Sequence, residues 1–309
     1  MSKATEQLFL AEINPHKECD FLLAISGGVD SMVLANLFLT NNLNFSIAHC
    51  NFQLRGKDSD DDEVFINKWC SENNIRLYNK KFSTEDYCKK NKITIQMGAR
   101  ELRYEWFREL IQKENHDFIV TAHHLDDQLE TFIINSIRGT GIDGLAGIPD
   151  RINKIIRPLL MIPKEQIIEF SKENKISYRE DSSNDKENYL RNKIRHSVIP
   201  YLKSDDQNVL LKFKTTIENL NSTKLFVEKI ISDLKIRIFV YKENTIITNI
   251  DLLKDLDPIE FYIHELYKDF EFNYKEILKL FDSDSGKYIS SLKYKMTKQK
   301  NNLIISKIK

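Results

Sequence analysis

The segment SGGVDS, residues 26–31, is the feature that most restricts the folds open to this chain. It follows the apolar run FLLAI of residues 21–25 and precedes the apolar stretch of residues 32–39, which predicts a strand, a tight loop and a helix. Adjacent glycines let the backbone approach a ligand, and the helix that follows points free N–H groups at the loop. Ser26 and Ser31 add hydroxyl groups, so the segment predicts a site for a phosphate anion.

This loop differs from the phosphate loop of kinases and GTPases, because no lysine follows its glycines. Asp30 stands there instead, and it is a candidate ligand for a magnesium ion bound to phosphate. Two glycines with Asp30 as a helix cap would also make a plain turn. The flanking strand and helix favour the phosphate interpretation.

Composition limits the classes of protein that fit. The chain has 309 residues, enough for about two domains, and its 41% hydrophobic and 30% charged residues are typical of a globular protein. No apolar run reaches the roughly 18 residues that span a bilayer, and the N-terminal segment lacks a signal-peptide pattern. We therefore expect a cytoplasmic protein with no membrane partner.

Cysteine and charge patterns exclude several kinds of site. None of the four cysteines forms a Cys-x-x-Cys pair, which favours reduced thiols over disulfides, zinc or an iron–sulfur cluster. The 46 basic and 46 acidic residues cancel, so a uniformly basic surface for nucleic acid is excluded. We expect the acidic run 58–63 to be the solvated start of a helix, and the basic run 191–196 leaves local charge asymmetry open.

Short apolar runs alternate with amphipathic segments from residue 21 to about residue 160. The pattern predicts strands at 21–25, 45–50, 76–82, 117–122 and 155–159, with helices at 30–40, 59–73, 99–114 and 126–138. Such alternation indicates an α/β fold with a doubly wound, mainly parallel sheet. Ligands of these sheets bind at the carboxyl ends of the strands, where segments 26–31, 49–51 and 123–127 fall.

The chain changes character after Pro163. We expect a helical appendage with a helix at 164–175, a polar stretch at 178–184 and a helix at 189–199 that Pro200 ends. A long helix at 206–235 then leads to strands at 238–248, 287–297 and 302–306 and helices at 258–270 and 274–281. These elements predict a domain boundary near residue 205, with a catalytic domain at 1–205 and a smaller mixed α+β domain at 206–309.

The segment TAHHLDDQLET, residues 121–131, is the second candidate site. If a helix starts near residue 126, Asp127 and Glu130 share the face of its first turn. Two carboxylates there could be ordinary surface groups at a helix start, or they could bind an ammonium group or magnesium. Adjacent histidines at a strand end favour a site, and their spacing disfavours zinc.

The segment GARELRYEWF, residues 98–107, is the third. Arg100 and Arg103 fall on one helical face near Gly98, which could let the chain approach a ligand. Two guanidinium groups suit the clamping of phosphate, and ion pairs with Glu101 or Glu105 are the plainer alternative.

Two neighbouring stretches have structural interpretations. We expect the aromatic residues of segment 104–107 to lie in the core rather than to stack on bases. Segment 139–149 is too rich in glycine for a helix, which leaves either a plain connection or a loop that faces a substrate.

These segments together resemble a known family. SGGVDS is similar to the PP-loop of the N-type ATP pyrophosphatases, which split ATP into an adenylate and pyrophosphate. With TAHHLDDQLET, GARELRYEWF, RGTGIDGLAGI, YREDSSN and RNKIRHSVIP, the chain resembles the tRNA(Ile)-lysidine synthases over about residues 20–203. The tail SGKYISSLKYKMTKQKNNLIIS resembles the middle domain of that family. Many members continue into a further domain that helps to hold the tRNA acceptor stem, and a short form of the family exists.

The resemblance implies a ligase that forms a C–N bond. ATP would adenylate the C2 carbonyl oxygen of the wobble cytidine of tRNA(Ile) with a CAU anticodon, with release of pyrophosphate. The ε-amine of free lysine would then displace AMP to give lysidine. ATP and Mg²⁺ are the implied substrate and ion, tRNA and lysine are the implied partners, and a homodimer is consistent with the family.

The resemblance also implies roles for individual residues. The residues implied for ATP binding are Ser26, Gly27, Gly28, Val29, Asp30, Ser31 and His49, with Asp30 as the magnesium ligand. Those implied for lysine binding are His123, Asp127 and Glu130. Those implied to contact phosphate, tRNA or the cytosine carbonyl are Arg100, Arg103, Arg191 and Arg195, with Arg100 as first choice. Asp30, Arg100, Asp127 and Glu130 would be the catalytic residues.

Two alternatives stay open at this point. Another PP-loop enzyme would show a cysteine pair or iron–sulfur ligands if it thiolated tRNA, or a glutaminase domain or ammonia channel if it made GMP. A catalytically inactive RNA-binding relative would be expected to lose SGGVDS or the pair of carboxylates at 127 and 130, and both are intact. Basic residues of the tail are candidates for tRNA contacts by charge alone: Lys287, Lys293, Lys295, Lys298 and Lys300.

Overall fold

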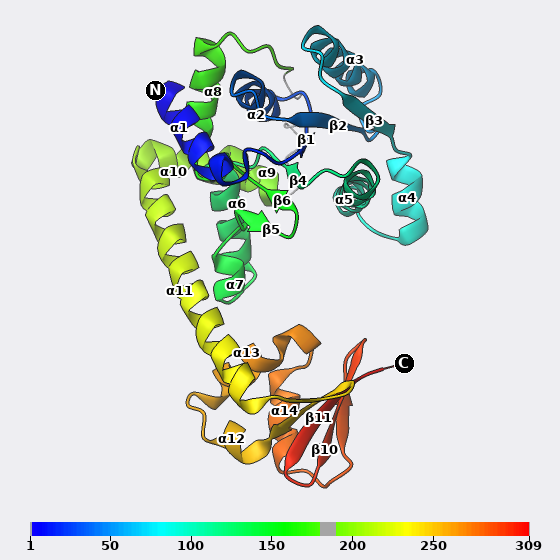
Figure 1. Cartoon of the computed structure of the whole chain (residues 1–309). Helices are drawn as coiled ribbons and strands as arrows, with labels where there is room; N and C mark the ends of the chain where they lie inside the picture. The colour runs from blue at the N-terminus through cyan, green and yellow to red at the C-terminus, as the bar shows by residue number, and fades with distance from the viewer. Residues whose placement is uncertain (1, 180–189, 309) are drawn as a thin grey trace. The chain divides into compact units, whose positions relative to one another are not determined.

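The chain is described by a computed structural model that covers residues 2–179 and 190–308 (Figure 1). These residues form two compact units, Met1–Leu220 and Asn221–Lys309, and helix α11, Val209–Ile238, contributes to both. Residues 180–184 of the predicted polar stretch, and residue 189 at the predicted start of a helix, lie outside the described residues. The predicted domain boundary near residue 205 stays a prediction.

The first unit is built on a six-stranded sheet with the order β3-β2-β1-β4-β6-β5. Its strands are β1 Phe21–Ala24, β2 Phe45–Asn51, β3 Leu77–Lys81, β4 Phe118–Val120, β5 Arg151–Ile152 and β6 Ile155–Ile156. Neighbouring strands run parallel except β5, which is antiparallel to β6. The predicted doubly wound, mainly parallel α/β sheet is therefore confirmed.

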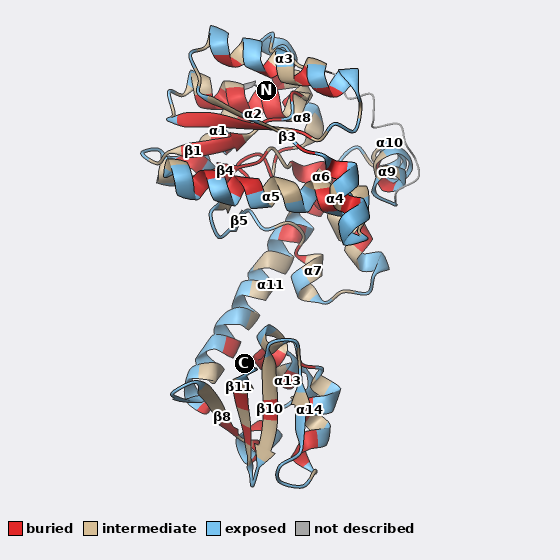
Figure 2. Ribbon diagram, turned by 90° about the vertical axis from the view of Figure 1, so that its right-hand side faces the viewer, coloured by how far each residue is buried: buried red, intermediate tan, exposed pale blue. Residues whose placement is uncertain are grey.

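Helices bury both faces of this sheet, as the burial colours of Figure 2 show. One face packs against α1 Ser2–Ile13, α2 Val29–Thr40, α3 Lys57–Glu72 and α8 Lys164–Glu173, and the other packs against α5 Ile95–Glu114. Phe38 of α2 is fully buried, and its ring lies 5.1 Å from that of Phe21 and 5.7 Å from that of Phe45. These edge-to-face contacts fix α2 directly behind the loop that follows β1.

A second group of helices belongs to the first unit. Its members are α6 Leu125–Ile137, α7 Ile142–Leu145, α9 Leu190–Lys193, the π-helix η3 Ile194–Val198 and α10 Ile199–Asp205. Leu129, Ile199 and Phe213 pack α6 and α10 against the first turns of α11. The prediction that Pro200 ends a helix was wrong: Pro200 lies in the first turn of α10, where its missing N–H costs no hydrogen bond. The prediction that segment 139–149 contains no helix was also wrong, because α7 forms one turn there.

Gly98 has a packing role instead of the predicted approach to a ligand. Helix α5 begins at Ile95, before the predicted start, and the Oγ1 atom of Thr94 caps it by accepting the Met97 N–H at 3.3 Å. Gly98 is therefore inside the helix, and a Cβ atom there would lie 2.2 Å from the Sγ atom of Cys88 in α4, Thr84–Asn91. The glycine lets α4 and α5 pack closely together.

The second unit contains a five-stranded antiparallel sheet with the order β7-β8-β11-β10-β9. Its elements are β7 Val240–Lys242, β8 Thr245–Asn249, α12 Ile250–Lys254, α13 Ile259–Tyr267, α14 Tyr274–Phe281, β9 Tyr288–Ser290, β10 Tyr294–Gln299 and β11 Asn302–Lys307. Fully buried Leu253, Ile263 and Met296 join the helices to the sheet. The predicted mixed α+β class is confirmed, although the strands predicted at 238–248 and 287–297 are hairpins. Every helix among the described residues is too short or too polar to cross a bilayer.

Candidate active site

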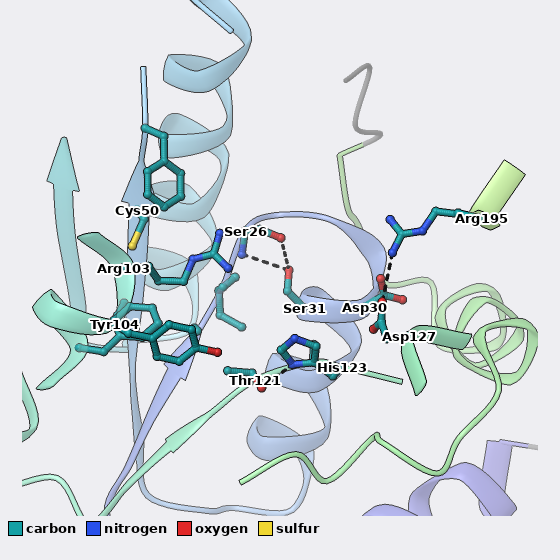
Figure 3. Close-up of a pocket in the computed structure, with 16 residues that line it drawn as sticks. Ser26, Asp30, Ser31, Cys50, Arg103, Tyr104, Thr121, His123, Asp127 and Arg195 are labelled. Atoms are coloured by element: carbon teal, nitrogen blue, oxygen red, sulfur yellow. Dashed lines mark hydrogen bonds and ion pairs between the residues drawn. The ribbon is translucent and has the colours of Figure 1, made fainter. Parts of the chain in front are cut away.

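The strand order creates a point where the sheet topology reverses. β1 lies between β2 and β4, so the chain leaves β1 toward one side of the sheet and returns to the other side at β4. Ligands of open α/β sheets bind at such points, beyond the carboxyl ends of the strands. The loops after β1 and β4 line a cavity of about 360 Å³ there, which we name the strand-end cavity (Figure 3). Its polar lining residues are Ser26, Asp30, Ser31, Arg103, Tyr104, Thr121, His123, Asp127 and Arg195.

The SGGVDS loop is closed upon itself by Ser31. The Ser31 Oγ atom accepts the N–H groups of Ser26 at 3.3 Å and Gly27 at 3.1 Å, and it donates to the carbonyl oxygen of Gly28 at 2.8 Å. Gly27 has φ +95°, which favours glycine, and Gly28 is the extended residue that precedes α2. These bonds hold the loop in one shape at the N-terminus of α2, and they engage the hydroxyl group predicted to bind ATP.

Asp30 lies in the first turn of α2 and binds a cation of the protein itself. The Nζ atom of Lys164 is 2.5 Å from Asp30 Oδ1, and the Nε2 atom of His124 is 3.7 Å from Asp30 Oδ2. The Asp30 side chain remains 27% exposed, so its carboxylate is accessible from the cavity. A carboxylate that already holds an ammonium group at a phosphate loop has the chemistry for magnesium, which takes one or two carboxylates and completes its shell with water and phosphate oxygens.

Asp127 lies in the first turn of α6 with both of its oxygens engaged. Oδ2 accepts the backbone N–H of His124 at 3.0 Å, and Oδ1 accepts the Nη2 donor of Arg195 at 3.1 Å. Burial alone would raise the pKa of Asp127, but His124, His123 and Arg195 hold the pKa of its carboxyl below the usual range. Asp127 is therefore an ionised carboxylate on the wall of the cavity.

Glu130 shares the face of Asp127, as its spacing predicts, but it is covered by two arginines. Its side chain is only 1% exposed, and Arg195 binds it through Nε at 2.5 Å and Nη2 at 2.9 Å. Arg191 contributes at a longer distance, 3.4 Å, while donating to the hydroxyl of Thr131 at 2.9 Å. Burial raises the pKa of Glu130, and Arg195 opposes that change. Residues predicted to bind lysine and residues predicted to contact tRNA thus form one cluster.

The two neighbouring histidines differ in charge preference. His123 lines the strand-end cavity with its Nδ1 atom 2.8 Å from the hydroxyl of Thr121, and burial lowers its pKa to about 4. Burial also acts to lower the pKa of His124, but the carboxylates of Asp127, Asp126 and Asp30 outweigh it and raise the pKa. His123 is a neutral imidazole near pH 7, and His124 favours the protonated form more than an ordinary histidine does.

His49, predicted to bind ATP, lines neither this cavity nor the second one described below. It belongs to β2, is 3% exposed, and its Nδ1 atom is 2.9 Å from the carbonyl oxygen of Ile25. Because a carbonyl only accepts, Nδ1 carries the proton, and burial lowers the pKa of the ring. His49 holds the backbone just before the loop, and the next residue, Cys50, lines the cavity in its place.

The two arginines of α5 lie in different places. Arg103 lines the strand-end cavity with its guanidinium 5.2 Å from the ring centroid of Phe52. Arg100 is exposed, stacks over Tyr104 at 4.9 Å, and lines a separate surface hollow outside the strand-end cavity. The geometry therefore favours Arg103 over Arg100, which the sequence placed first. Trp106 and Phe107 are buried in the core, as predicted. The same prediction was wrong for Tyr104, which is half-buried and lines the strand-end cavity.

A second cavity, of about 820 Å³, borders the loop and the helices α6, α8 and α10, and we name it the helix-side cavity. It shares Ser26, Asp30, Asp127 and Arg195 with the strand-end cavity. Three of its basic residues were missed by the sequence analysis: Lys164, Arg179 and Lys203. Lys203 binds both Asp126 and Glu165. Burial raises the pKa of Asp126, but His124 and Lys203 outweigh it and hold that carboxyl well below its usual range.

Arg179 ties the loop to the acidic run of α3. Its backbone N–H donates to the carbonyl oxygen of Gly27 at 2.9 Å, and its Nε donates to Asp62 at 2.7 Å. Arg55 binds the other oxygen of Asp62, also at 2.7 Å. The acidic run does begin a helix, as predicted, but the expectation of a solvated run was wrong for Asp62, which is 7% exposed. Nothing local in the sequence marks this pairing, because the two partners lie more than 100 positions apart.

The chain matches two family models. One, described as a PP-loop domain, matches residues 1–202, and the other, a TilS substrate binding domain, matches residues 241–308. Similar proteins include a tRNA(Ile)-lysidine synthase of Bacteroides thetaiotaomicron, 36% identical over 93% of this chain and 67% of that protein. Another, from Bacillus subtilis, is 33% identical over 74% of this chain and 50% of that protein. The chain thus spans about half to two thirds of the length of these relatives.

A solved structure resembles the fold at lower identity. It is the U34-tRNA thiolase NcsA from Methanococcus maripaludis with its 4Fe-4S cluster, which has a TM-score of 0.59 and 19% identity. The match covers 71% of this chain and 78% of that chain. At this identity the likeness concerns the fold alone.

Proposed function

The chain belongs to the PP-loop family and, within it, to the tRNA(Ile)-lysidine synthases, and from this membership we propose that it joins lysine to the wobble cytidine of tRNA(Ile) with a CAU anticodon. The observation that carries the proposal is the position of the ionised carboxylate of Asp127. It stands beside the phosphate loop, in the wall between two cavities. One cavity can hold an activated nucleotide while the other admits an amine.

ATP binds with its phosphates at the SGGVDS loop and its nucleoside in the strand-end cavity. The N-terminus of α2 and the hydroxyl of Ser26 face the phosphates, and Ala48 and Phe107 provide apolar walls for the nucleoside. Asp30 would hold magnesium, which offsets the charge of the phosphates when it is bound. Ser31 acts mainly by holding the loop in shape.

In the first half-reaction the C2 carbonyl oxygen of cytidine attacks the α-phosphorus of ATP. A bond forms between oxygen and phosphorus, and the bond to pyrophosphate breaks with its electron pair on the leaving group. Arg103 makes no ion pair with any described residue and lines the cavity, so its guanidinium is available to bind a phosphate oxygen as charge develops. Arg100 lies farther out, where it suits a contact with the backbone of bound RNA.

In the second half-reaction the ε-amine of lysine attacks C2, and the C2–oxygen bond breaks so that AMP leaves. The ε-ammonium must first lose a proton. Asp127 is the ionised carboxylate that binds the ammonium and accepts this proton. His123, a neutral imidazole in the strand-end cavity, orients the same nitrogen. Glu130 is covered by arginines, so it acts by holding Arg195 and, through it, Asp127.

The second unit binds part of the tRNA substrate. Its match to a substrate binding domain supports this role. A cation beside an exposed aromatic ring supports it as well: the ammonium of half-buried Lys295 lies 3.9 Å from the ring centroid of exposed Tyr288. Whether the protein forms a homodimer stays a prediction, which light scattering of the purified chain would decide.

One assay tests the proposed function. Purified protein is incubated with ATP, magnesium, labelled lysine and a transcript of tRNA(Ile) with a CAU anticodon, and label in the tRNA is counted. We expect label in this transcript and none when its wobble cytidine is replaced by uridine. Absence of label from the cytidine transcript would refute the proposal.

A variant tests the role of Asp127. Asp127→Asn should lower lysine transfer by about 100-fold or more, which is the usual contribution of a positioned acid or base, while adenylated tRNA still forms. Asp86→Asn is the matched control, because Asp86 is an exposed carboxylate in the first turn of α4. Transfer by Asp127→Asn at the wild-type rate would show that the lysine site lies elsewhere.

A further inference from the structure

We propose that Lys164 is a catalytic residue that binds the pyrophosphate leaving group, so that helix α8 provides the lysine that the SGGVDS loop lacks. The inference rests on the proposed function, because it takes the loop to bind the phosphates of ATP. Lys164 lies 134 positions from Asp30 in the sequence, and its ammonium is nevertheless the cation that meets the loop.

Two helices bring this ammonium to the loop. Lys164 is the first residue of α8, and Asp30 lies in the first turn of α2. The two helices pack against each other in the core of the first unit, with Ile167 and Phe170 of α8 buried there. The ion pair at 2.5 Å places the Lys164 ammonium at the first turn of α2. The N-terminus of α2 favours an anion at the loop, and the Lys164 ammonium adds a positive charge there.

The backbone of Lys164 is fixed while its ammonium keeps free donors. The backbone N–H donates to Asp126 Oδ2 at 2.9 Å, and Lys203 in turn holds Asp126. The ammonium has three donors, and within residues 2–179 and 190–308 Asp30 is its only hydrogen-bond partner. The side chain is 29% exposed and borders the helix-side cavity beside Gly28. The remaining donors can therefore reach a phosphate held at the loop.

Charge favours a protein cation at this point beside the magnesium proposed for Asp30. A pyrophosphate at the loop would be repelled by the carboxylate of Asp30, and the ammonium of Lys164 lies where it reduces that repulsion. Lys203 is less suited to this task, because its ammonium already binds two carboxylates, Asp126 and Glu165. Lys164 binds one carboxylate, and a charged hydrogen bond from it to an oxygen of the leaving group would stabilise the charge that grows there in the transition state.

The first measurement is the binding of inorganic pyrophosphate to the full chain, by titration calorimetry in EDTA so that no metal takes part. Lys164→Met should weaken binding at least about tenfold, since it removes a charged hydrogen bond. Lys172→Met is the matched control, because Lys172 is an exposed lysine in the last turn of the same helix. The affinity of this variant for pyrophosphate should equal that of the wild type. Thermal melting of each variant verifies that it is folded.

A second background separates direct binding from an effect through Asp30. If Lys164 only neutralised Asp30, then Lys164→Met would have no effect on pyrophosphate binding in a protein that already carries Asp30→Asn. If Lys164 binds the phosphate itself, the loss of about tenfold or more persists in the Asp30→Asn background. Persistence of the loss supports the proposal, and its disappearance overturns it.

The outcomes distinguish this inference from the proposed function. Failure of the wild-type chain to bind pyrophosphate both in EDTA and with added magnesium would refute the assignment of the loop, and both proposals would fall. If the wild type binds only with magnesium, the same variants are compared in magnesium with the same expected results. Normal binding by wild type and by Lys164→Met alike would overturn the role of Lys164 and leave the proposed function standing. The rate of tRNA adenylation without lysine gives an independent readout, and Lys164→Met should lower that rate while Lys172→Met should not.

Discussion

The cluster of Glu130, Arg195 and Arg191 allows a quantitative prediction for the stability of the first unit. Arg195→Met removes two hydrogen bonds, at 2.5 and 2.9 Å, from a carboxylate whose side chain is 1% exposed. Loss of one partner from a buried pair usually costs about 3–5 kcal/mol, because the other charge is left buried without compensation. We take about 3 kcal/mol, since Arg195 itself is 37% exposed and water can replace part of the contact.

The assay is urea unfolding of the wild type and two variants at pH 8. Arg191→Met is the matched control: Arg191 contacts the same carboxylate at 3.4 Å and is 46% exposed, so its loss should cost about 1 kcal/mol or less. In melting temperature the loss of about 3 kcal/mol corresponds to roughly 6–12 °C for a unit of this size. An equal cost for the two substitutions would refute the reasoning.

The pH dependence provides a second check on the same variant. Burial already raises the folded-state pKa of Glu130, and loss of Arg195 should raise it further. The uncompensated charge then exists at pH 8 and is removed by protonation as the pH falls. The stability gap between wild type and Arg195→Met should therefore narrow steadily from pH 8 toward pH 4.5. A gap that is constant over this range would show that the lost stability comes from packing instead of charge.

Three further predictions follow from single contacts. Gly98→Ala should lower the free energy of unfolding by about 1–3 kcal/mol through overpacking against Cys88. Adding Cys88→Ala should restore part of this stability in thermal melts, and a double variant less stable than Gly98→Ala would contradict the reasoning. Arg103→Met should raise the KM for ATP more than Arg100→Met does, and the reverse order would restore the ranking made from the sequence. The pKa of His123 is about 4 in the folded state against 6.5 ordinarily, so its contribution to stability is complete above pH 6.5 and is lost as the pH falls toward 4. Between pH 7.5 and pH 5 the wild type should lose about 2 kcal/mol more than His123→Gln in urea unfolding, and equal losses would show that His123 is not the group responsible.

The sheet of the first unit could be predicted because its signal is local. Strands buried on both faces must be apolar throughout, as in β1 and β2, and each is followed by a helix with its own apolar pattern. Helix α1 was missed although Phe9 and Ile13 are fully buried, because charged residues interrupt its apolar pattern and it precedes the first βαβ unit. Hairpins of the second unit were merged into single strands because their turns contain no glycine. Glu243 adopts φ +49° in the turn between β7 and β8, a backbone conformation that a glutamate in the sequence does not predict.

The residues of the candidate site also divide into those that a local pattern predicts and those that only the folded structure brings together. SGGVDS could be interpreted because loop, helix start and hydroxyl groups all lie within six residues. Spacing also placed Asp127 and Glu130 on one face of a helix. It could not show that Arg195, 65 positions after Glu130, covers that carboxylate and leaves Asp127 as the accessible one. Lys164 was missed for the same reason, since its approach to Asp30 depends on how two helices pack in the folded protein and on no motif.

Synthesis from the N-terminus produces the carboxylates of the site before the cations that neutralise them. The last strand of the sheet, β6, ends at Ile156, whereas Lys164, Arg195 and Lys203 all come later in the chain. A nascent chain that ends at β6 thus contains every strand of the sheet and the complete SGGVDS loop, but none of these three cations. Asp30, Asp126, Asp127 and Glu130 are then present without these partners. A ribosome adds residues at about 5–20 per second, so a growing chain has its nucleotide loop some seconds before it has the charges that complete the site.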